Sequence, residues 1–353
     1  MLDKKNFYIN GKWVSPTEPK TCKVIDPSNE QPCAEISLGG KKDIDKAVGA
    51  AKKAFETWSF TKKEERLELL EKLYVIYKKR WAEMAKLIST EMGAPMKFST
   101  EMQAATGASH IKSFKNILKD FQFERDLGEE KNNQKLLYEP KGVCALITPW
   151  NWPINQVNLK VIPALASACT VVLKPSEIAP LSSMLLAEMI EEVKFPAGVF
   201  NLINGDGAIT GDALTSHPDI NMISFTGSTR AGALISQNAA KDFKRISLEL
   251  GGKGANIIFK DADSEAVTRG VLRCFRNSGQ ACNAPTRMLV EKSIYNETVK
   301  KVKELANNTK VDSPRKDGNH IGPVVSEVQF NKIQTLIQKG IDEGAKLVAG
   351  GTG

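Results

Sequence analysis

The sequence predicts an α/β protein built on a doubly wound parallel sheet. Short apolar runs alternate with helix-like segments, and the runs at 142–150, 169–175, 198–203 and 221–227 each read as a buried strand. Polar segments follow directly after these runs, and in such sheets ligands bind beyond the carboxyl ends of the strands. With 353 residues, the chain is also long enough that two domains are expected.

The other elements follow in chain order. Residues 41–120 are predicted as long amphipathic helices, because apolar residues recur three and four positions apart. The polar stretch 126–142 is bounded by Gly and Pro and predicts an exposed arm or hairpin, whereas 182–193 predicts a helix between two strands. A second unit is expected to begin near 248–259, and residues 345–353, "AKLVAGGTG", are predicted as a strand followed by a turn.

The charge balance gives only weak support for a nucleic-acid partner. The formal net charge is +8, yet both signs alternate in stretches such as 62–80. The hypothesis that the protein is a basic nucleic-acid binder rests on this charge alone and is not favoured. Because the longest apolar run, 161–173, is too short to span a bilayer and no signal peptide is seen, no membrane association is expected.

The cysteines indicate a reducing compartment. They are scattered without a CxxC pair, and the chain has only three histidines, so neither a disulfide framework nor a metal site is expected. The cytoplasm is therefore the predicted location. The six positions are Cys22, Cys33, Cys144, Cys169, Cys274 and Cys282.

The segment "FTGSTRAG" predicts the beginning of a helix directly after a strand. Ser228 and Thr229 are good N-cap residues, and a helix N-terminus suits a pyrophosphate. Gly227 and Gly232 do not form the GxGxxG fingerprint, however, so an ordinary strand–turn–helix is the alternative.

The segment "LKPSE" follows another strand and predicts contacts with a nucleotide ribose. Lys174 can reach a ribose hydroxyl, and Glu177 can accept a hydrogen bond from a 2′-hydroxyl. The carboxylate would repel a 2′-phosphate, which favours NAD over NADP. The alternative is that Pro175, Ser176 and Glu177 only begin and cap a helix.

Two further segments carry candidate catalytic groups. In "TPWNWP", rigid backbone on both sides holds the carboxamide of Asn151, as an oxyanion donor requires; the alternative is a hydrogen-bonded Asn in an aromatic core turn. In "SLELGGK", Glu249 stands in an apolar strand, where burial would make it a usable base near neutral pH. The alternative is a surface glutamate on an edge strand.

Cys282 is the candidate nucleophile. A thiol is the strongest nucleophile among side chains at neutral pH, although most free cysteines are inert small hydrophobes. Cys144 and Cys169 lie in apolar runs and fit that inert role, whereas Cys282 is flanked by Gly, Gln, Ala and Asn. No histidine lies near it in sequence, which argues against a protease-like pair. The three histidines are assigned no role.

In this order, "TPWNWP", "KPSE", "FTGST", "LELGGK" and "NSGQAC", followed by "IGPVVS" at 321–326, resemble the aldehyde dehydrogenase superfamily. The resemblance runs from "YINGKWV" near the N-terminus to the last residue. It implies a Rossmann-like NAD domain, a catalytic domain and a projecting oligomerisation arm. On this basis residues 1–125 and 142–249 are expected to form the NAD domain, 126–141 the arm, and 250–353 an incomplete catalytic domain.

The resemblance also implies a role for each matching residue. Cys282 matches the nucleophile, Glu249 the general base and Asn151 the oxyanion donor, together with the backbone N–H of Cys282. The implied NAD contacts are Lys174, Ser176 and Glu177 at the adenosine ribose, Trp150, Gly227, Ser228 and Gly232 at the pyrophosphate, Gly207 and Gly211 near the adenine, and additionally Ile147, Thr148 and Leu250.

The implied reaction is NAD-dependent oxidation of an aldehyde to the carboxylic acid through a thiohemiacetal and a thioester on Cys282. Glu249 argues against the CoA-acylating branch, which needs no water-activating base, and Glu177 against NADP. Asn155, Gln156 and Asn158 hint at a polar substrate tunnel, but the aldehyde itself is not disclosed by the sequence.

The family normally continues past residue 353, with a glutamate for the nicotinamide ribose and a strand that pairs with a neighbouring subunit. A homodimer or homotetramer is expected if the chain were complete, and the chain alone is expected to be unstable or weakly active because an open sheet exposes apolar edges. The alternative function is an impaired, truncated remnant that binds nucleotide or pairs with a full-length relative.

Overall fold

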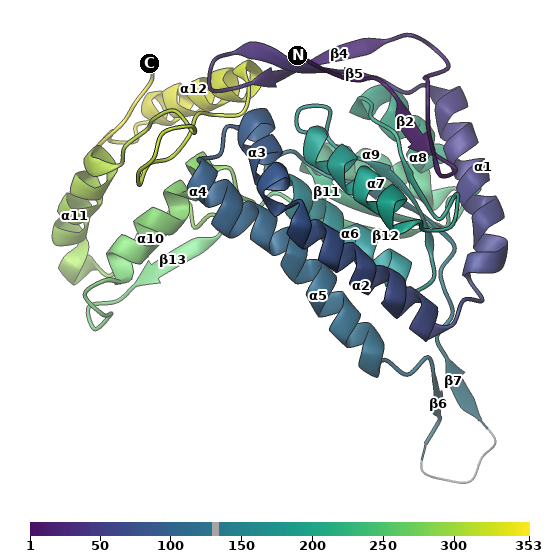
Figure 1. Cartoon of the computed structure of the whole chain (residues 1–353). Coiled ribbons are helices and arrows are strands. Elements are labelled where there is room, and N and C mark those ends of the chain that lie inside the picture. The colour runs from purple at the N-terminus through teal and green to yellow at the C-terminus, as the bar shows by residue number, and fades with distance from the viewer. Residues whose placement is uncertain (129–133) are drawn as a thin grey trace.

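The computed structural model describes residues 1–128 and 134–353 (Figure 1). Its largest element is a seven-stranded sheet with the strand order β12-β11-β8-β9-β10-β2-β3. β8 to β12 run parallel, and β2 joins antiparallel to β10. The strands are β2 (Phe7–Ile9), β3 (Lys12–Val14), β8 (Val143–Ile147), β9 (Thr170–Lys174), β10 (Phe200–Leu202), β11 (Met222–Gly227) and β12 (Arg245–Leu250). The predicted α/β class with a doubly wound parallel sheet is confirmed.

The central strands are apolar throughout because helices cover both faces of this sheet. On β8, Val143 and Ala145 pack into the cluster that includes Val48 of α1, whereas Cys144 and Leu146 pack into the cluster that includes Val157 of α6. One face carries α1 (Lys41–Trp58), α8 (Asp212–Ser216) and α9 (Thr229–Ala240), and the other carries α6 (Pro153–Ala166) and α7 (Leu181–Val193), with α2 (Lys63–Lys79) and α5 (Ala105–Asp120) packed outside them.

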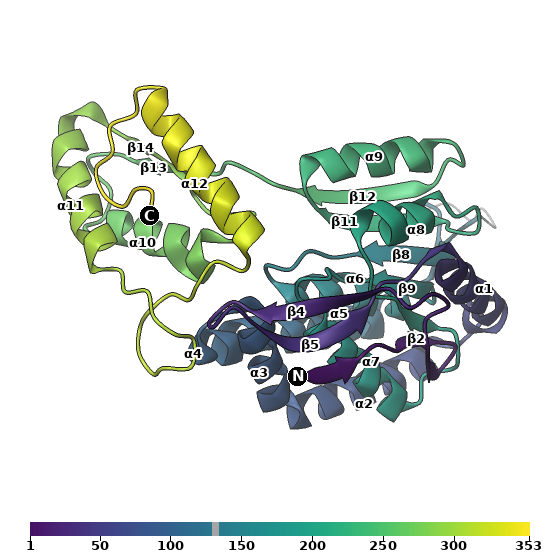
Figure 2. The ribbon, with the colours of Figure 1, turned by 90° about the horizontal axis from the view of Figure 1, so that it is seen from above.

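The helices predicted over 41–120 are present, and those over 81–104 pack against one another next to the second unit (Figure 2). This group comprises α3 (Trp81–Met92), α4 (Met96–Phe98) and the π-helix η1 (Ser99–Ala104). A three-stranded sheet of β1 (Leu2–Lys4), β5 (Gln31–Ser37) and β4 (Thr21–Asp26) arches over the same side of the molecule (Figure 1).

A hairpin projects away from the rest of the chain at the position of the predicted arm (Figure 1). It consists of β6 (Glu124–Asp126) and β7 (Lys135–Leu137), which pair antiparallel with Arg125 opposite Leu136. Of the arm predicted over 126–141, residues 129–133 lie outside the described part of the chain.

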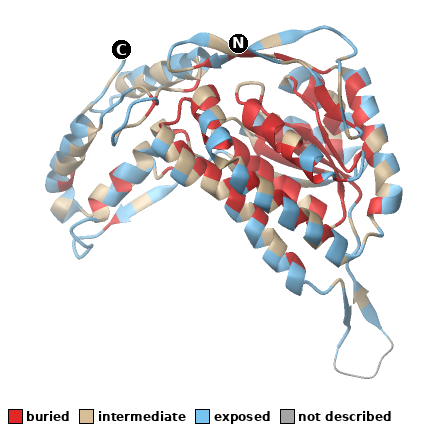
Figure 3. Ribbon diagram, viewed as in Figure 1, coloured by how far each residue is buried: buried red, intermediate tan, exposed pale blue. Residues whose placement is uncertain are grey.

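The second unit follows β12 and is built on its own small parallel sheet. β13 (Ala255–Ile258) pairs with β14 (Arg287–Val290), and the helices are α10 (Ala266–Phe275), α11 (Tyr295–Asn308) and α12 (Glu327–Asp342). Buried residues are concentrated in the larger part, whereas this unit is mostly exposed or half-buried (Figure 3). The predicted boundary between residues 249 and 250 stays a proposal; β12 ends at Leu250, and the link to β13 follows.

The two units are joined by two segments (Figure 2). One is the link after β12. The other is the segment 309–325, in which the chain runs back to the larger unit and lies against α3 and α4. The backbone N–H of Met96 donates to the carbonyl oxygen of Pro314 at 3.0 Å. Arg315 forms an ion pair with Asp26, a buried residue at the end of β4.

The strand predicted at 345–349 is wrong, since these residues have no regular secondary structure. A strand needs a neighbouring strand to satisfy its backbone groups. Here Leu347 and Val348 instead line a hollow against the helices, with Val302 of α11 and Ile337 of α12. No helix in the described parts of the chain is both long and apolar enough to cross a membrane.

Candidate active site

The predicted site segments gather at one edge of the seven-stranded sheet. β8, β9, β11 and β12 are neighbours and parallel, and they end at Ile147, Lys174, Gly227 and Leu250. The chain leaves β8 toward β9 and later returns to its other side as β11, so the winding direction reverses between β8 and β11. Such a switch point opens a crevice at the carboxyl ends of the strands.

The segment after β9 is anchored by Lys174, which is fully buried. Its Nζ donates to the carbonyl oxygens of Gly205 at 2.6 Å and Pro175 at 2.9 Å, and lies 3.6 Å from Glu177 Oε2. Burial lowers the pKa of Lys174, while the charge of Glu177 acts in the opposite direction. Lys174 therefore holds the 174–177 turn against the β10 loop.

Ser176 and Glu177 do not cap the following helix, which was the structural alternative for this segment. α7 begins at Leu181 after Pro180 and has no side-chain cap from its N-cap residue. The hydroxyl of Ser176 accepts from the backbone N–H of Ile178 at 3.3 Å. The carboxylate of Glu177 is partly exposed beside the turn.

Gly207 and Gly211 bound the π-helix η2 (Gly207–Gly211) after β10. Asp206 begins it, because its Oδ1 accepts from the backbone N–H of Ile209 at 2.7 Å. Gly207 is exposed, and a Cβ added to it would meet nothing within 4 Å. Gly211 is buried, and a Cβ added to it would lie 4.0 Å from Lys174 Cδ. The two glycines therefore have different surroundings.

The segment after β11 forms the predicted turn and helix. Ser228 caps α9, since its Oγ accepts from the backbone N–H of Ala231 at 3.3 Å. A Cβ on Gly232 would lie 2.9 Å from Leu250 Cδ2, so this glycine lets α9 lie close to β12. Both the phosphate-binding role and the ordinary strand–turn–helix role fit this geometry.

Two buried hydroxyls at the same edge have no hydrogen-bond partner among the described residues. They are Thr148 Oγ1, directly after β8, and Thr226 Oγ1, near the end of β11. Orphaned buried polar groups are costly, and a bound polar ligand is one way to satisfy them. Together with the capped N-terminus of α9, these groups fit a bound dinucleotide.

The structure brings Asn151 and the loop of Cys282 together. Asn151 Nδ2 donates to the carbonyl oxygen of Gln280 at 3.1 Å, two residues before Cys282. A Cβ on Gly252 would lie 3.3 Å from the carbonyl oxygen of Cys282, so the segment after Glu249 also contacts this loop. Cys282 is exposed, whereas Cys144 and Cys169 are buried as predicted.

The burial predicted for Glu249 is wrong. The side chain is exposed; β12 is the edge strand of its sheet and, within the described residues, pairs only with β11. Residues of β12 alternate between exposed and half-buried, so helix α9 covers one face and nothing in the described chain covers the other. The surface glutamate on an edge strand, which was the alternative, describes this position.

Lys160 is a residue that sequence reasoning missed. It lies buried on α6, and its Nζ donates to Ser224 Oγ of β11 at 3.0 Å. Burial lowers its pKa to about 8, and the charge of Glu249 opposes that shift. A lone charged residue within the apolar helix 153–166 was the signal that could have identified it.

The three amides predicted to make a polar tunnel have different surroundings. Asn158 is fully buried and donates to the carbonyl oxygen of Gly107 at 2.9 Å, and Gln156 is also buried. Only Asn155 is half-buried, 2.8 Å from Nε2 of His110. Of the three amides, Asn155 alone is partly accessible, and it contacts His110, a histidine that had been assigned no role.

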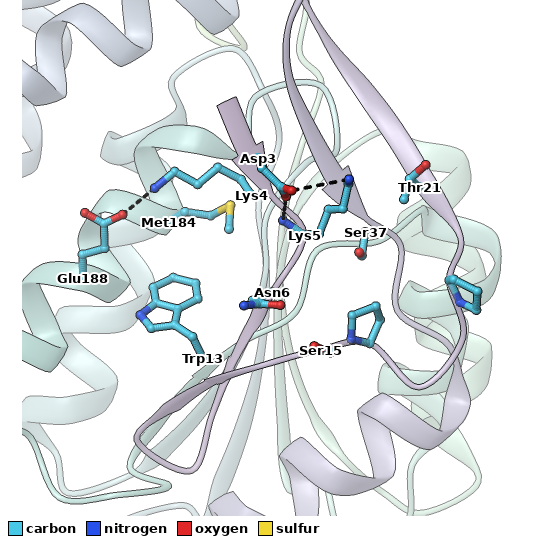
Figure 4. A pocket seen from close by; sticks show the side chains of 12 residues that line it. Asp3, Lys4, Lys5, Asn6, Trp13, Ser15, Thr21, Ser37, Met184 and Glu188 are labelled. Carbon is cyan, nitrogen blue, oxygen red and sulfur yellow. Dashed lines mark hydrogen bonds and ion pairs between the residues drawn. The ribbon is translucent and has the colours of Figure 1, made fainter. Parts of the chain in front are cut away.

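A surface cavity of about 570 Å³ lies elsewhere, between the N-terminal strands and α7 (Figure 4). It contains none of the predicted site residues. Lys4 and Glu188 form an ion pair at 2.7 Å in its wall. A second cavity, of about 420 Å³, lies between the α4–η1 group and residues 318–323, and Asn277 and Ser278 line it.

A doubly wound sheet with an exposed cysteine loop held against its carboxyl edge is the arrangement of an α/β enzyme with a candidate thiol nucleophile at its ligand-binding edge. The chain belongs to the aldehyde dehydrogenase family, whose model matches residues 13–353. It is 48% identical to 3-succinoylsemialdehyde-pyridine dehydrogenase of a Pseudomonas species, in an alignment covering 100% of this chain and 74% of that protein.

Solved structures show the same likeness. The aldehyde dehydrogenase of Bartonella henselae is 60% identical with a TM-score of 0.98, covering 100% of this chain and 74% of that one. A cysteine-to-alanine mutant of Pseudomonas syringae aldehyde dehydrogenase C, in complex with NAD+ and octanal, is 44% identical with a TM-score of 0.96, covering 99% of this chain and 71% of that one. This chain thus spans about three quarters of each.

Proposed function

We propose that this chain oxidises an aldehyde to a carboxylic acid with NAD as the hydride acceptor, using Cys282 as the nucleophile. The observation that best supports this proposal is the 3.1 Å hydrogen bond from Asn151 Nδ2 to the carbonyl oxygen of Gln280. It holds a side-chain amide beside the Cys282 loop at the carboxyl edge of the sheet. The family membership and the NAD+ complexes among its structural relatives support the cofactor.

The first step is addition of the Cys282 thiolate to the aldehyde carbon, which makes a thiohemiacetal. The carbonyl oxygen becomes an oxyanion, and the N–H groups of Asn151 Nδ2 and of the Cys282 backbone stabilise it. NAD, when bound, supplies the acceptor for the hydride that leaves this carbon. Cys282 then holds the acyl group as a thioester.

The second step is hydrolysis. Glu249 takes a proton from water, the resulting hydroxide attacks the thioester carbon, and the Cys282 thiolate leaves as the acid is released. Water activation of this kind distinguishes the hydrolytic reaction from acyl transfer to CoA.

The residues proposed to hold NAD lie along the strand ends described above. Lys174, Ser176 and Glu177 are assigned to the adenosine ribose, and Glu177 favours NAD over NADP by charge. The remaining proposed contacts are Ile147, Thr148, Trp150, Gly207, Gly211, Gly227, Ser228, Gly232 and Leu250. A cytoplasmic location and a homodimer or homotetramer also remain proposals.

The test is NADH formation with a panel of aliphatic, aromatic and carboxylate-bearing aldehydes, with and without CoA. We expect NADH without CoA and no turnover by Cys282→Ser. Cys274→Ser, which changes a half-buried cysteine eight positions upstream, is the matched control and should retain activity. Iodoacetamide labelling of another thiol in place of Cys282 would refute the assignment.

The exposure of Glu249 favours a second candidate, a nucleotide-binding protein that does not turn over. In that case the thioester would form without efficient hydrolysis, because the base is not enclosed with its water. Calorimetry would detect NAD binding, and mass spectrometry would detect acylated Cys282 that persists. Release of stoichiometric acid over many cycles would exclude this candidate.

A further inference from the structure

The turn that precedes Cys282 has an unusual backbone. Asn277, Ser278 and Gly279 follow one another in the left-handed region, with φ of 57°, 58° and 75°. Glycine adopts this region freely and Asn tolerates it, but a run of three is rare. Such a conformation persists only where surrounding contacts determine it. The contacts come from three distant segments of the chain.

The side chain of Asn277 lies at the centre of these contacts and is buried. Its Nδ2 donates to two carbonyl oxygens, that of Asn151 at 2.9 Å and that of Gln280 at 3.1 Å. Its Oδ1 accepts from Nε2 of Gln103 on η1 at 3.4 Å. One carboxamide thus connects the turn, the loop after β8 and the π-helix.

The carbonyl oxygen of Gln280 fixes how the carboxamide of Asn151 points. This oxygen accepts from Nδ2 of both Asn151 and Asn277, each at 3.1 Å. Because a carbonyl oxygen can only accept, the group of Asn151 that faces it is the NH₂ and not Oδ1. One N–H of Asn151 is used in this bond, and the second is left for another acceptor.

The other side of the turn is held by residues 322–325. Gln280 Oε1 accepts from the backbone N–H of Val325 at 3.0 Å, and Gln280 Nε2 donates to the carbonyl oxygen of Asn277 at 3.1 Å. The hydroxyl of Ser278 donates to the carbonyl oxygen of Gly322 at 2.7 Å. Each of the residues 277, 278 and 280 therefore has a side-chain bond that locks the turn.

We propose that Asn277 is a positioning residue: its amide aligns the free N–H of Asn151 with the backbone N–H of Cys282, so that both face one oxyanion. This inference rests on the proposed function, which assigns the oxyanion to those two groups. An Asp at 277 would have almost the same shape, but its carboxylate would face the two carbonyl oxygens that Nδ2 now binds.

Two reactions of the same thiol separate positioning from general damage. In the first, Cys282 attacks para-nitrophenyl acetate, the acetyl group passes to sulfur, para-nitrophenolate leaves, and an oxyanion forms on the way. In the second, sulfur displaces iodide from iodoacetamide and no oxyanion forms. We expect Asn277→Asp to slow acylation by roughly 10- to 100-fold, below the full cost of losing an oxyanion donor, and to change alkylation by less than about threefold.

Asn277→Gly is the second variant, because glycine accepts the left-handed backbone without the amide, and the same selective loss is expected. Asn296→Asp, an exposed position on α11, is the control for added charge and should change neither rate. Unchanged acylation in both Asn277 variants, or equal loss in both reactions, would overturn the positioning role. A wild-type chain that is alkylated at Cys282 but never acylated would overturn the proposed function as well.

Discussion

Gly93 and Gly322 are in direct backbone contact: a Cβ added to Gly322 would lie 2.0 Å from the carbonyl oxygen of Gly93. Gly93 ends α3 with a φ of 75°, and Gly322 belongs to the loop that receives the hydroxyl of Ser278. Next to this contact, Val325 packs with Met92. Through Gly93 and Met92, the larger unit therefore supports the loop 322–325, which in turn holds the turn before Cys282.

Gly322→Ala should lower the free energy of unfolding by about 1–3 kcal/mol, since the new methyl group meets backbone and the chain itself must move. Urea titration followed by circular dichroism measures the change. Gly340→Ala is the matched control, because that glycine lies in α12 with nothing within 4 Å, and Ala should stabilise a helix interior there by up to ~1 kcal/mol. Equal stabilities of wild type and Gly322→Ala would contradict the contact.

Glu91 should make stability depend on pH. This buried carboxylate accepts from the backbone N–H groups of Leu181 and Ser182 at the start of α7, at 2.5 and 3.1 Å. Burial raises its pKa to about 7 from 4.5, although those bonds act in the opposite direction. The folded state therefore holds the proton more tightly, and stability is lost as pH rises from about 4.5 through about 7.

The variant Glu91→Gln removes this titration. Relative to the variant, the wild type should lose on the order of 3 kcal/mol of unfolding free energy when the pH is raised from below about 4.5 to above about 7. Urea titrations across the range measure it. A pH-independent difference would mean that Glu91 is ionised throughout, with its charge compensated by the N-terminus of α7.

Lys160 should have the opposite effect to Glu91: it should make the free energy of unfolding increase as pH rises. Its pKa is lowered by burial to about 8 from 10.5, so the folded state holds its proton less tightly and stability increases as pH rises from about 8 to about 10.5. Lys160→Met should flatten that increase, which is on the order of 3 kcal/mol. Lys112→Met, an exposed position on α5, should leave the curve unchanged. A parallel curve for Lys160→Met would show that the ammonium is hydrated.

Glu177 should set the preference for NAD. Its carboxylate is partly exposed, 3.6 Å from the ammonium of Lys174, and would face a 2′-phosphate if the ribose binds there. Glu177→Gln should raise the ratio of kcat/KM for NADP to that for NAD by about tenfold, equivalent to removing one unfavourable interaction of ~1.4 kcal/mol. Glu192→Gln, exposed on α7, is the control. No change in the ratio would place the ribose elsewhere.

The sheet and its ligand-binding edge could be predicted because burial on both faces leaves a clear pattern. β8 and β9 are buried at every residue, and their apolar runs gave both the strands and the positions where they end. Asn151 and Cys282 were chosen for their chemistry, and the contact through Gln280 spans a sequence separation of 129 residues. Only the resemblance to a family predicted that they would meet.

The exposure of Glu249 could not be predicted, because alternation along a strand does not tell whether its second face is covered. The roles of Gln103 and Asn277 were missed for a related reason. Amides are ordinary surface residues in a sequence, and these two become buried only where η1 meets the turn. The strand predicted at 345–349 failed because apolar residues also pack against helices.

The division of the chain into two cores linked at 251–254 and 309–325 has a consequence for spectroscopy. All five tryptophans lie between Trp13 and Trp152, in the larger unit, and the smaller unit contains one tyrosine, Tyr295. Trp150 packs against the cluster that contains Val325, whereas the smaller core around Ile258, Val267 and Val271 includes no tryptophan among its described residues. Intrinsic fluorescence excited at the indole band therefore reports little about melting of that smaller core. If the smaller core loosens first, ellipticity will decline while the emission maximum stays where it was, and the two traces will not superimpose.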